Sequence, residues 1–146
     1  MKLKFVTPVA QNYLKVKAGF TQDLFLSLAP PWAKVELKQF DGCKVGDEIH
    51  VEIKRPPLTI NWVSLITKEE TTDREWIFVD EGKKTPWPIT HWRHLHRVIK
   101  ITEDETHIVD DIEYSCSSPL LEKMIYPTMW ATFAVRPSRF KEFFKG

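Results

Sequence analysis

The feature that most constrains this chain is a run of strand-like segments that occupies its middle, with only short polar turns between them. In these segments the helical period of the preceding residues gives way to the period of two that is typical of β-strands. The segments are Lys34–Phe40, Glu48–Lys54, Thr59–Thr67, Glu75–Asp80, His91–Thr102 and Thr106–Tyr114. Because parallel neighbours need long crossover connections, strands joined by such short turns predict an antiparallel meander.

Helical signals lie on the N-terminal side of this run. Lys2–Val6 alternates like a first strand, and Thr7-Pro8 predicts the start of a helix, because proline is tolerated at the first helical position. This first short helix is expected to end at Gly19. A second short helix is expected to begin at Thr21 and to end at Pro30-Pro31.

After Ser118-Pro119 the chain is predicted to be helical to its end, with apolar side chains along one face. Pro127 and Pro137 each remove a helical hydrogen bond, so kinks or breaks are expected there. The order of strand, two short helices, six strands and a long helix predicts an α+β fold. In this fold a curved antiparallel sheet wraps around the C-terminal helix, and such curvature commonly leaves a pocket.

Length and composition limit the classes of protein that are possible. The chain of 146 residues fits one domain spanning residues 1–146, and its 42% hydrophobic and 28% charged residues are typical of a globular protein. The net charge of +1 gives no general attraction to nucleic acid or to anionic membranes. Because we find neither a signal peptide nor a membrane-spanning run, we expect a cytoplasmic protein with two free cysteines. The oligomeric state stays open.

One strand carries an unusual concentration of imidazoles, the stretch THWRHLHRVIKIT at residues 90–102. Since side chains alternate across a strand, one of its faces carries Trp92, His94 and His96. On the next strand Asp110 and Tyr114 fall on the matching face. This face is aromatic and apolar with few polar groups, and we interpret it as the inner face of the sheet.

The register of these two strands follows from the turn between them. A three-residue turn at residues 103–105 pairs Thr102 with Thr106 and places Asp110 diagonal to His96. A slip of one residue would turn every side chain to the other face. On the preceding strands the same even-numbered alternation adds Trp62, Ser64, Trp76, Phe78 and Asp80, although their odd-numbered neighbours could equally point inward.

Several stretches together resemble a known group of proteins. They are LSLAPPWAKVELKQFDGCKVGDEIHVEI, WVSLIT, FVDEG, HWRHLHRV, IVDDIEY and MIYPTMWATFAVRP. This pattern resembles the bacterial START-like ligand-binding proteins of the SRPBCC group, which share the helix-grip fold with the birch-pollen-allergen and polyketide-cyclase families. The likeness covers nearly the whole chain and agrees with the order of elements above.

The resemblance implies a deep cavity between the sheet and the last helix, and it transfers no catalytic motif. The residues that it implies as cavity lining are Trp62, Trp76, Phe78, Trp92, His94, His96, Asp110, Tyr114, Met124, Met129 and Phe133. The superfamily includes lipid carriers, hormone receptors, cyclases and oxygenase domains, so the fold alone does not decide the function. We therefore expect a small hydrophobic or amphipathic ligand as partner, with no cofactor, no metal and no nucleic acid.

Two other functions stay open beside this binding function. An acid–base enzyme of the cyclase or dehydratase type would use His94 or His96 as base and Asp110 to orient it, with Tyr114 or Ser64 holding an oxygen. A metal site would use the pair His94 and His96 with Asp110 as third ligand. Each of these side chains also has a plain role as a core residue, and the catalytic residues stay unknown.

Overall fold

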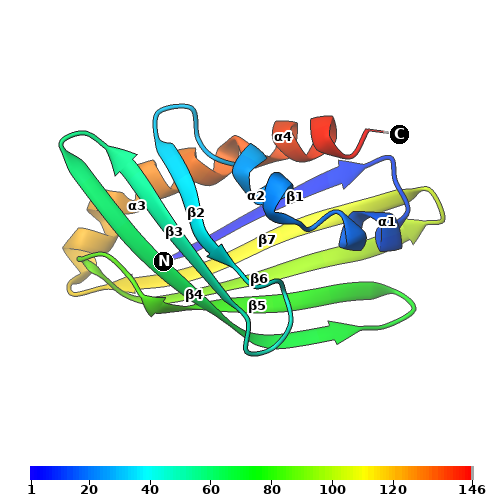
Figure 1. The fold of residues 1–146 in the computed structure, drawn as a ribbon, viewed down its shortest axis with the longest axis horizontal. Coiled ribbons are helices and arrows are strands. Elements are labelled where there is room, and N and C mark those ends of the chain that lie inside the picture. Colours follow the sequence, from blue (N-terminus) through cyan, green and yellow to red (C-terminus); the bar gives the residue numbers. More distant parts are fainter. Residues whose placement is uncertain (146) are drawn as a thin grey trace.

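The computed structural model describes residues 1–145 and consists of one seven-stranded sheet with four helices (Figure 1). The elements are β1 (Lys2–Val9), α1 (Tyr13–Ala18), α2 (Gln22–Ser27), β2 (Lys34–Phe40), β3 (Glu48–Arg55), β4 (Leu58–Thr71), β5 (Glu75–Lys84), β6 (Ile89–Thr102), β7 (Glu105–Cys116), α3 (Pro119–Ala134) and α4 (Arg136–Phe143). Every strand pairs with its neighbours antiparallel, in the order β1-β7-β6-β5-β4-β3-β2. The predicted α+β meander is therefore confirmed.

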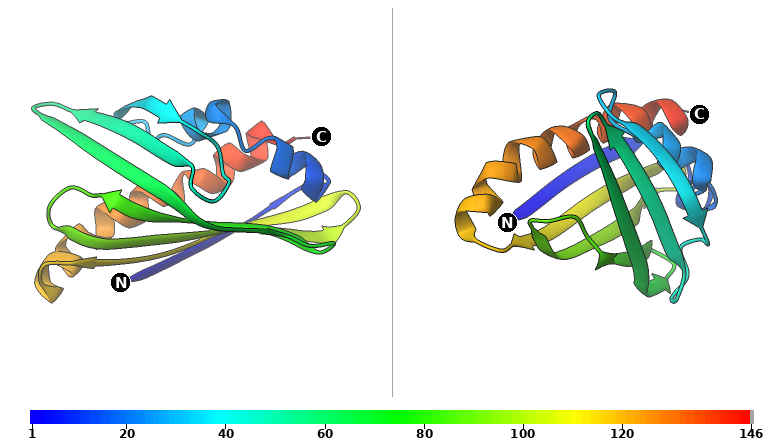
Figure 2. Two further views of the ribbon diagram at one scale, coloured as in Figure 1. Left: turned by 60° about the horizontal axis from the view of Figure 1, so that its bottom comes forward. Right: turned by 60° about the vertical axis from the view of Figure 1, so that its left-hand side comes forward.

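The sheet is strongly curved, and the helices lie over its concave side. Figure 2 shows α3 and α4 running across the sheet on that side, with β2 and β3 folded back toward them. This is the arrangement predicted from the order of elements, a curved sheet that wraps around a C-terminal helix.

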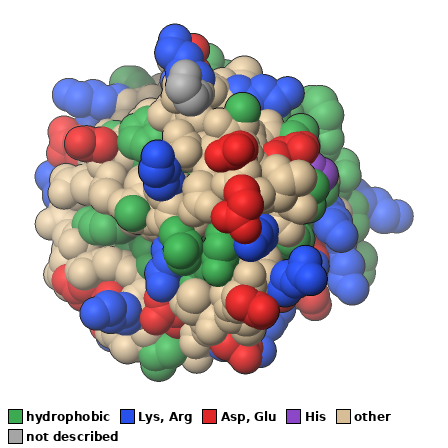
Figure 3. All heavy atoms as spheres, turned by 90° about the vertical axis from the view of Figure 1, so that its right-hand side faces the viewer, with side chains coloured by type: hydrophobic (Ala, Val, Ile, Leu, Met, Phe, Trp, Pro, Cys, Tyr) green, Lys and Arg blue, Asp and Glu red, His purple; other side chains and the backbone are tan. Residues whose placement is uncertain are grey.

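No helix within residues 1–145 is long and apolar enough to cross a membrane. At the end of the molecule seen in Figure 3, basic, acidic and apolar side chains are intermixed.

The start of the first helix differs from the prediction, which placed it at Thr7-Pro8. Instead β1 continues to Val9, which pairs with Thr106 of β7. Proline is tolerated in β1 because β1 is an edge strand. The helix α1 begins after Asn12, whose side chain accepts a hydrogen bond from a backbone N–H of the first turn, and it ends at Gly19 as expected.

The C-terminal helix is divided by a break at Val135. Ser118 caps α3 as expected and accepts a hydrogen bond from a backbone N–H of its first turn. The helix continues through Pro127, where a break or kink was expected, whereas Pro137 lies in the first turn of α4, directly after the break. The break places Arg136 at the start of α4, close to the sheet.

The interior contains two apolar clusters. The first core cluster lies between the sheet and the helices α1, α2 and α4, and its larger aromatic members are Tyr13, Phe20, Trp76, Phe78, Phe140 and Phe144. The second core cluster lies toward β1 and α3 and consists of Leu3, Ile89, Trp92, Ile112, Tyr114, Cys116 and Phe133. Burying one such large apolar side chain stabilises the fold by about 1.5–3 kcal/mol. The candidate site lies between the two clusters.

Candidate functional site

The pairing of β6 with β7 brings the polar residues of the inner face together. Thr102 pairs with Glu105, one residue earlier than predicted, and an irregularity between Lys100 and Thr102 shifts the pairing once more, so that Lys100 pairs with Thr106. The predicted register is therefore wrong by two residues. A slip of two keeps every side chain on its face, so the predicted faces are right. Asp110 lies directly opposite His96, whereas the prediction placed it on the diagonal.

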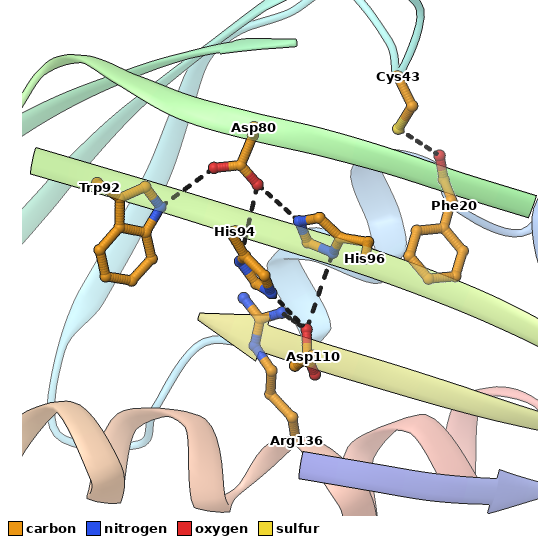
Figure 4. A network of polar contacts seen from close by, with 8 residues as sticks. All are labelled: Phe20, Cys43, Asp80, Trp92, His94, His96, Asp110 and Arg136. Carbon is orange, nitrogen blue, oxygen red and sulfur yellow. Dashed lines mark hydrogen bonds and ion pairs between the residues drawn. The ribbon is translucent and has the colours of Figure 1, made fainter. Parts of the chain in front are cut away.

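Four ionisable side chains occupy the middle of this face and form what we call the Asp–His network: Asp80, His94, His96 and Asp110 (Figure 4). Their exposed fractions are 7%, 3%, 2% and 2%. They come from three adjacent strands, since β5 places Asp80 opposite His94 and β7 places Asp110 opposite His96. Buried ionisable groups are costly unless they are paired, so their contacts decide whether the site is stable.

Each imidazole of the network spans the two carboxylates, and the two rings do so in opposite directions. His96 Nε2 lies 2.6 Å from Asp80 Oδ2, and His94 Nε2 lies 2.8 Å from Asp110 Oδ1. Because an ionised carboxylate only accepts hydrogen bonds, both contacts need an N–H on Nε2. The Nδ1 atoms face the other carboxylate at longer range, 3.7 Å for His94 to Asp80 and 3.8 Å for His96 to Asp110. An additional proton would therefore bind at Nδ1.

Aromatic rings enclose the two imidazoles. His94 and His96 stack with centroids 3.6 Å apart, and Phe78 stacks on His96 at 4.1 Å. Phe133 of α3 meets His94 edge-on at 5.5 Å. Since Phe78 belongs to the first core cluster and Phe133 to the second, the stack joins the two clusters.

Two further side chains donate hydrogen bonds to the carboxylates of Asp80 and Asp110. The indole N–H of Trp92 donates to Asp80 at 3.2 Å, and the guanidinium of Arg136 donates to Asp110 at 3.0 Å. Arg136 also lies over the ring of Phe133, 4.5 Å from its centroid. Within residues 1–145 every buried side-chain nitrogen and oxygen has a hydrogen-bond partner.

The charges of the network follow from these contacts. Burial alone would raise the pKa of Asp110, but the positive charge of Arg136 and the hydrogen bond from His94 hold it well below its usual range. Asp80 behaves in the same way: burial opposes ionisation, and its contacts with both histidines lower its pKa. Burial, followed by the neighbouring His94, lowers the pKa of His96 to about 4. At neutral pH the network therefore contains two carboxylates, a guanidinium and a neutral His96.

The same residues include a set that could bind a metal ion. Ligand atoms of Asp80, His94 and His96 lie within 4.8 Å of one another, so the third ligand would be Asp80, whereas the sequence pointed to Asp110. A zinc ion needs lone pairs that converge on one point about 2.0–2.2 Å from each ligand atom. The two ring planes are stacked with centroids 3.6 Å apart, so lone pairs lying in these planes do not converge on one point, and His96 Nε2 already bonds Asp80. A metal would bind only after that hydrogen bond broke and the rings separated.

The residues predicted as ligand contacts fall into several groups. Trp76 and Phe78 belong to the first core cluster, and Trp92, Tyr114 and Phe133 belong to the second. The indole of Trp62 and the side chain of Met129 are partly buried against the second cluster, and Ser64 is buried.

Two of the predicted contacts have surroundings that the sequence did not indicate. Met124 is 64% exposed, so it does not join the others; because α3 is apolar on most sides, its inward face was ambiguous. The hydroxyl of Tyr114 donates to the backbone oxygen of Glu122 at 3.0 Å. Its predicted role of holding a substrate oxygen would therefore cost a hydrogen bond to α3.

Two open clefts lie at the surface. The α3 cleft, of about 290 Å³, lies between α3 and the β2–β3 side of the sheet and is lined by Trp32, Arg55, Pro127, Thr128 and Ala131. The turn cleft, of about 450 Å³, lies beside the end of β1 and the β6–β7 turn and is lined by Pro8, Val9, Ala10, Thr102, Asp104 and Glu105. The predicted ligand-binding residues line neither cleft.

Sequence reasoning missed Trp32, Arg55 and Arg136. Arg55 continues the alternation of Ile53 and the earlier inward-facing residues of β3, and this signal could have placed it on the concave face. Arg136 could have been found from Pro137, since a helix that restarts there redirects the preceding side chain toward the sheet. Trp32 carries no comparable signal because it lies in a loop.

Comparisons with known proteins define the fold. No family model matches the sequence, and no curated protein matches it. Among solved structures, a norcoclaurine synthase from Thalictrum flavum in complex with dopamine and hydroxybenzaldehyde is similar, with a TM-score of 0.67 and 15% identity over 97% of this chain and 84% of that one.

Two bacterial structures are also similar. The ZhuI aromatase/cyclase from Streptomyces sp. R1128 has a TM-score of 0.66 and 13% identity over 97% of this chain and 94% of that one. A START superfamily protein from Mycobacterium smegmatis has a TM-score of 0.65 and 9% identity over 97% of each chain. The chain therefore has the helix-grip fold of SRPBCC and START-like proteins over nearly its whole length, as its resemblance implied.

Proposed function

We propose that this protein binds an apolar or amphipathic small molecule between α3 and the concave face of the sheet. The observation that carries the proposal is the α3 cleft. Its volume of about 290 Å³ is at the lower end of the range of small-molecule sites, about 300–1,000 Å³. Its lining of three apolar side chains, one hydroxyl and one guanidinium matches the usual character of such sites, apolar walls with a few polar groups.

The strands beside the cleft support the proposal. Val51 and Trp62 pair across β3 and β4, as do Ile53 and Ile60, and all four side chains are only partly buried. Within residues 1–145, the backbone of α3 comes close to β1, β7 and α4 but not to β3 or β4. The concave side is thus incompletely covered at this end, and apolar surface there gains free energy when a ligand covers it.

The shared fold gives a second, weaker support. A norcoclaurine synthase with this fold has been solved with dopamine and hydroxybenzaldehyde, both small aromatic molecules. Of the residues predicted from the sequence, we propose that the partly buried Trp62 and Met129 lie nearest the ligand, behind the side chains that line the cleft. We propose that the buried residues behind them support these two side chains: Ser64, Trp76, Phe78, Asp80, Trp92, His94, His96, Asp110, Tyr114 and Phe133.

Native mass spectrometry and a probe titration test the proposal. A ligand captured during expression would add a few hundred daltons that denaturation removes. In parallel, 2-naphthamide is titrated into wild type, Ala131→Trp and Lys141→Trp by NMR. We expect Ala131→Trp, which fills the cleft, to weaken binding at least about tenfold, and Lys141→Trp, on the exposed side of α4, to bind like wild type. The proposal is wrong if neither captured ligand nor millimolar probe binding is found, or if Ala131→Trp binds the probe as well as wild type.

A second candidate function is acid–base catalysis by His94 or His96 with Asp110. The Asp–His network supports it, because each ring has a carboxylate at Nε2 that fixes its tautomer and leaves Nδ1 to exchange a proton. Substrate access requires Phe133 or Arg136 to move, since both imidazoles are buried.

Proton exchange on a bound ketone tests this second function. The α-protons of 2-acetylnaphthalene are followed by NMR in D2O, with and without protein. If the network is a catalytic base, exchange with wild type exceeds the buffer rate and falls about 100-fold or more in His94→Gln or His96→Gln. Thermal unfolding of the same variants separates this loss from loss of the fold. Exchange at the buffer rate with wild type would remove this candidate.

A further inference from the structure

We propose that the ligand of the α3 cleft is a small anion, a planar apolar carboxylate, whose charged group binds Arg55 and whose body packs against the indole of Trp32. This inference rests on the proposed function, because it names the class of ligand that the cleft binds. It is carried by the position of Arg55, by the pairing of the cations around it and by the composition of the lining.

Arg55 is placed on the concave side by the alternation of β3. It is the last residue of that strand and pairs with Leu58 at the beginning of β4. Ile49 lies on the same face of β3 as Ile53, four residues earlier, and is buried. Since side chains two residues apart share a face, Arg55 continues the row of Ile49 and Ile53 to the rim, where it lines the α3 cleft.

The cations on the other face of these strands are already paired. Lys38 and Lys54 contact Glu36 and Glu52, and Lys34 contacts Glu36. Those contacts use the even-numbered side chains of β2 and β3. Within residues 1–145 no carboxylate forms an ion pair with Arg55.

The lining of the cleft therefore contains a cation and no acid. Beside Arg55 it has only Trp32, Pro127, Thr128 and Ala131. A guanidinium presents a planar fork of N–H donors that matches a carboxylate. The turn cleft, in contrast, is lined by Asp104 and Glu105, so it repels the same anion.

The size and shape of the cleft define the rest of the ligand. Its volume of about 290 Å³ is close to the lower limit of about 300 Å³ for small-molecule sites, which favours a ligand of one or two rings. The indole of Trp32 is 42% exposed and offers an aromatic surface for stacking. Thr128 adds one hydroxyl that can donate a hydrogen bond to an oxygen of the ligand's carboxylate.

A matched pair of probes tests the inference. The probes are 2-naphthoate and 2-naphthamide, which have the same shape and differ in charge. Binding is measured by calorimetry, and the Trp32 indole N–H, assigned with Trp32→Phe, is followed by NMR. The variants are Arg55→Gln, Arg55→Lys and the control Arg74→Gln, an exposed arginine between β4 and β5 that does not line the cleft.

We expect 2-naphthoate to bind about fivefold more tightly than 2-naphthamide, a modest factor because Arg55 is exposed and its charge is screened. Arg55→Gln should abolish this difference, Arg55→Lys should keep part of it, and Arg74→Gln should leave it unchanged. The advantage of the acid should also shrink as salt rises.

The outcomes separate the two proposals. If both probes shift the Trp32 indole with equal affinity, and Arg55→Gln changes neither, the cleft binds ligands without preference for anions and this inference is wrong while the proposed function stands. If neither probe binds at millimolar concentration, this inference is wrong, and the proposed function fails with it when native mass spectrometry also finds no captured ligand. Tight binding of 2-naphthoate that leaves the Trp32 indole unmoved places the anion elsewhere and also overturns the inference.

Discussion

Replacement of Arg136 by methionine is the perturbation whose result follows most directly from the geometry of the Asp–His network. Arg136 donates to Asp110 at 3.0 Å and is the one guanidinium in contact with this carboxylate among residues 1–145. Methionine keeps most of the apolar stem and removes the charged guanidinium, whose carbon lies over the ring of Phe133. The matched control is Arg139→Met, because Arg139 lies on the same helix and donates at 3.0 Å to the neutral backbone oxygen of Ser27.

The expected cost follows from what each variant leaves behind. Breaking a buried ion pair by removing one partner costs about 3–5 kcal/mol. Asp110 keeps the hydrogen bond from His94 in the variant. Since the Arg136 side chain is 15% exposed, water can partly take the place of its guanidinium beside Asp110. We therefore expect Arg136→Met to lower the free energy of unfolding by about 2–3 kcal/mol, toward the value of a hydrogen bond to a charged group. Arg139→Met should cost about 0.5–1.5 kcal/mol, the value of a neutral hydrogen bond.

The assay is urea unfolding of wild type and both variants at a series of pH values. Arg136 lowers the pKa of Asp110, and a carboxyl with a depressed folded-state pKa contributes stability that is present above its unfolded pKa and lost as pH falls. In Arg136→Met the pKa of Asp110 should be higher, so its carboxyl takes up a proton earlier in an acid titration. The difference in unfolding free energy between wild type and Arg136→Met should therefore shrink as pH falls through that pKa.

Two results would contradict a stabilising ion pair between Arg136 and Asp110. If Arg136→Met costs no more than Arg139→Met at pH 7, the ion pair with Asp110 does not contribute to stability in water. If its cost stays the same down to pH 3, the effect comes from lost packing over Phe133 and not from the charge of Asp110.

Three further predictions concern stability. The folded-state pKa of His96, about 4, lies below its unfolded value of about 6.5. The stability that His96 contributes is therefore present above pH 6.5 and is lost as the pH falls toward 4. His96→Phe should flatten this part of the plot of unfolding free energy against pH, and an unchanged plot would assign the pH dependence to other groups. Asn12→Ala should cost about 1 kcal/mol in chemical denaturation, because α1 loses its N-cap bond, and Asn12→Ser should restore most of it. Phe140→Ala should cost about 3–5 kcal/mol because the ring is fully buried in the first core cluster, and a loss under 1 kcal/mol would contradict the packing described.

The fold could be predicted from the sequence because its signals are local. The period of two in the strands and the turn residues between them predict an antiparallel meander. The apolar face of the C-terminal segment predicts the helix around which this sheet wraps. The first helix was misplaced at Thr7-Pro8 because a cap-and-proline pattern also fits an edge strand, and only the pairing of Val9 with Thr106 distinguishes the two. Such pairing involves residues about a hundred positions apart, and a local periodicity does not predict which distant strand a segment will join.

The candidate site was predictable in part for the same reason. Alternation placed His94, His96 and Asp110 on one face correctly. The shorter turn, which pairs Thr102 with Glu105, and the irregularity between Lys100 and Thr102 each moved the register by one, and neither has a clear sequence signal. The partner that neutralises Asp110, Arg136, comes from a helix break distant in sequence. Contacts between elements that far apart depend on how the helices pack on the sheet, and no local pattern gives that.

Intermolecular NOEs from bound 2-naphthoate are the sharpest test of ligand binding in the α3 cleft. We expect NOEs from the ring protons to the methyl groups of Ala131 and Thr128, which line the α3 cleft. NOEs to Val9 and Ala10 of the turn cleft instead, or no intermolecular NOEs at saturating probe, would contradict it.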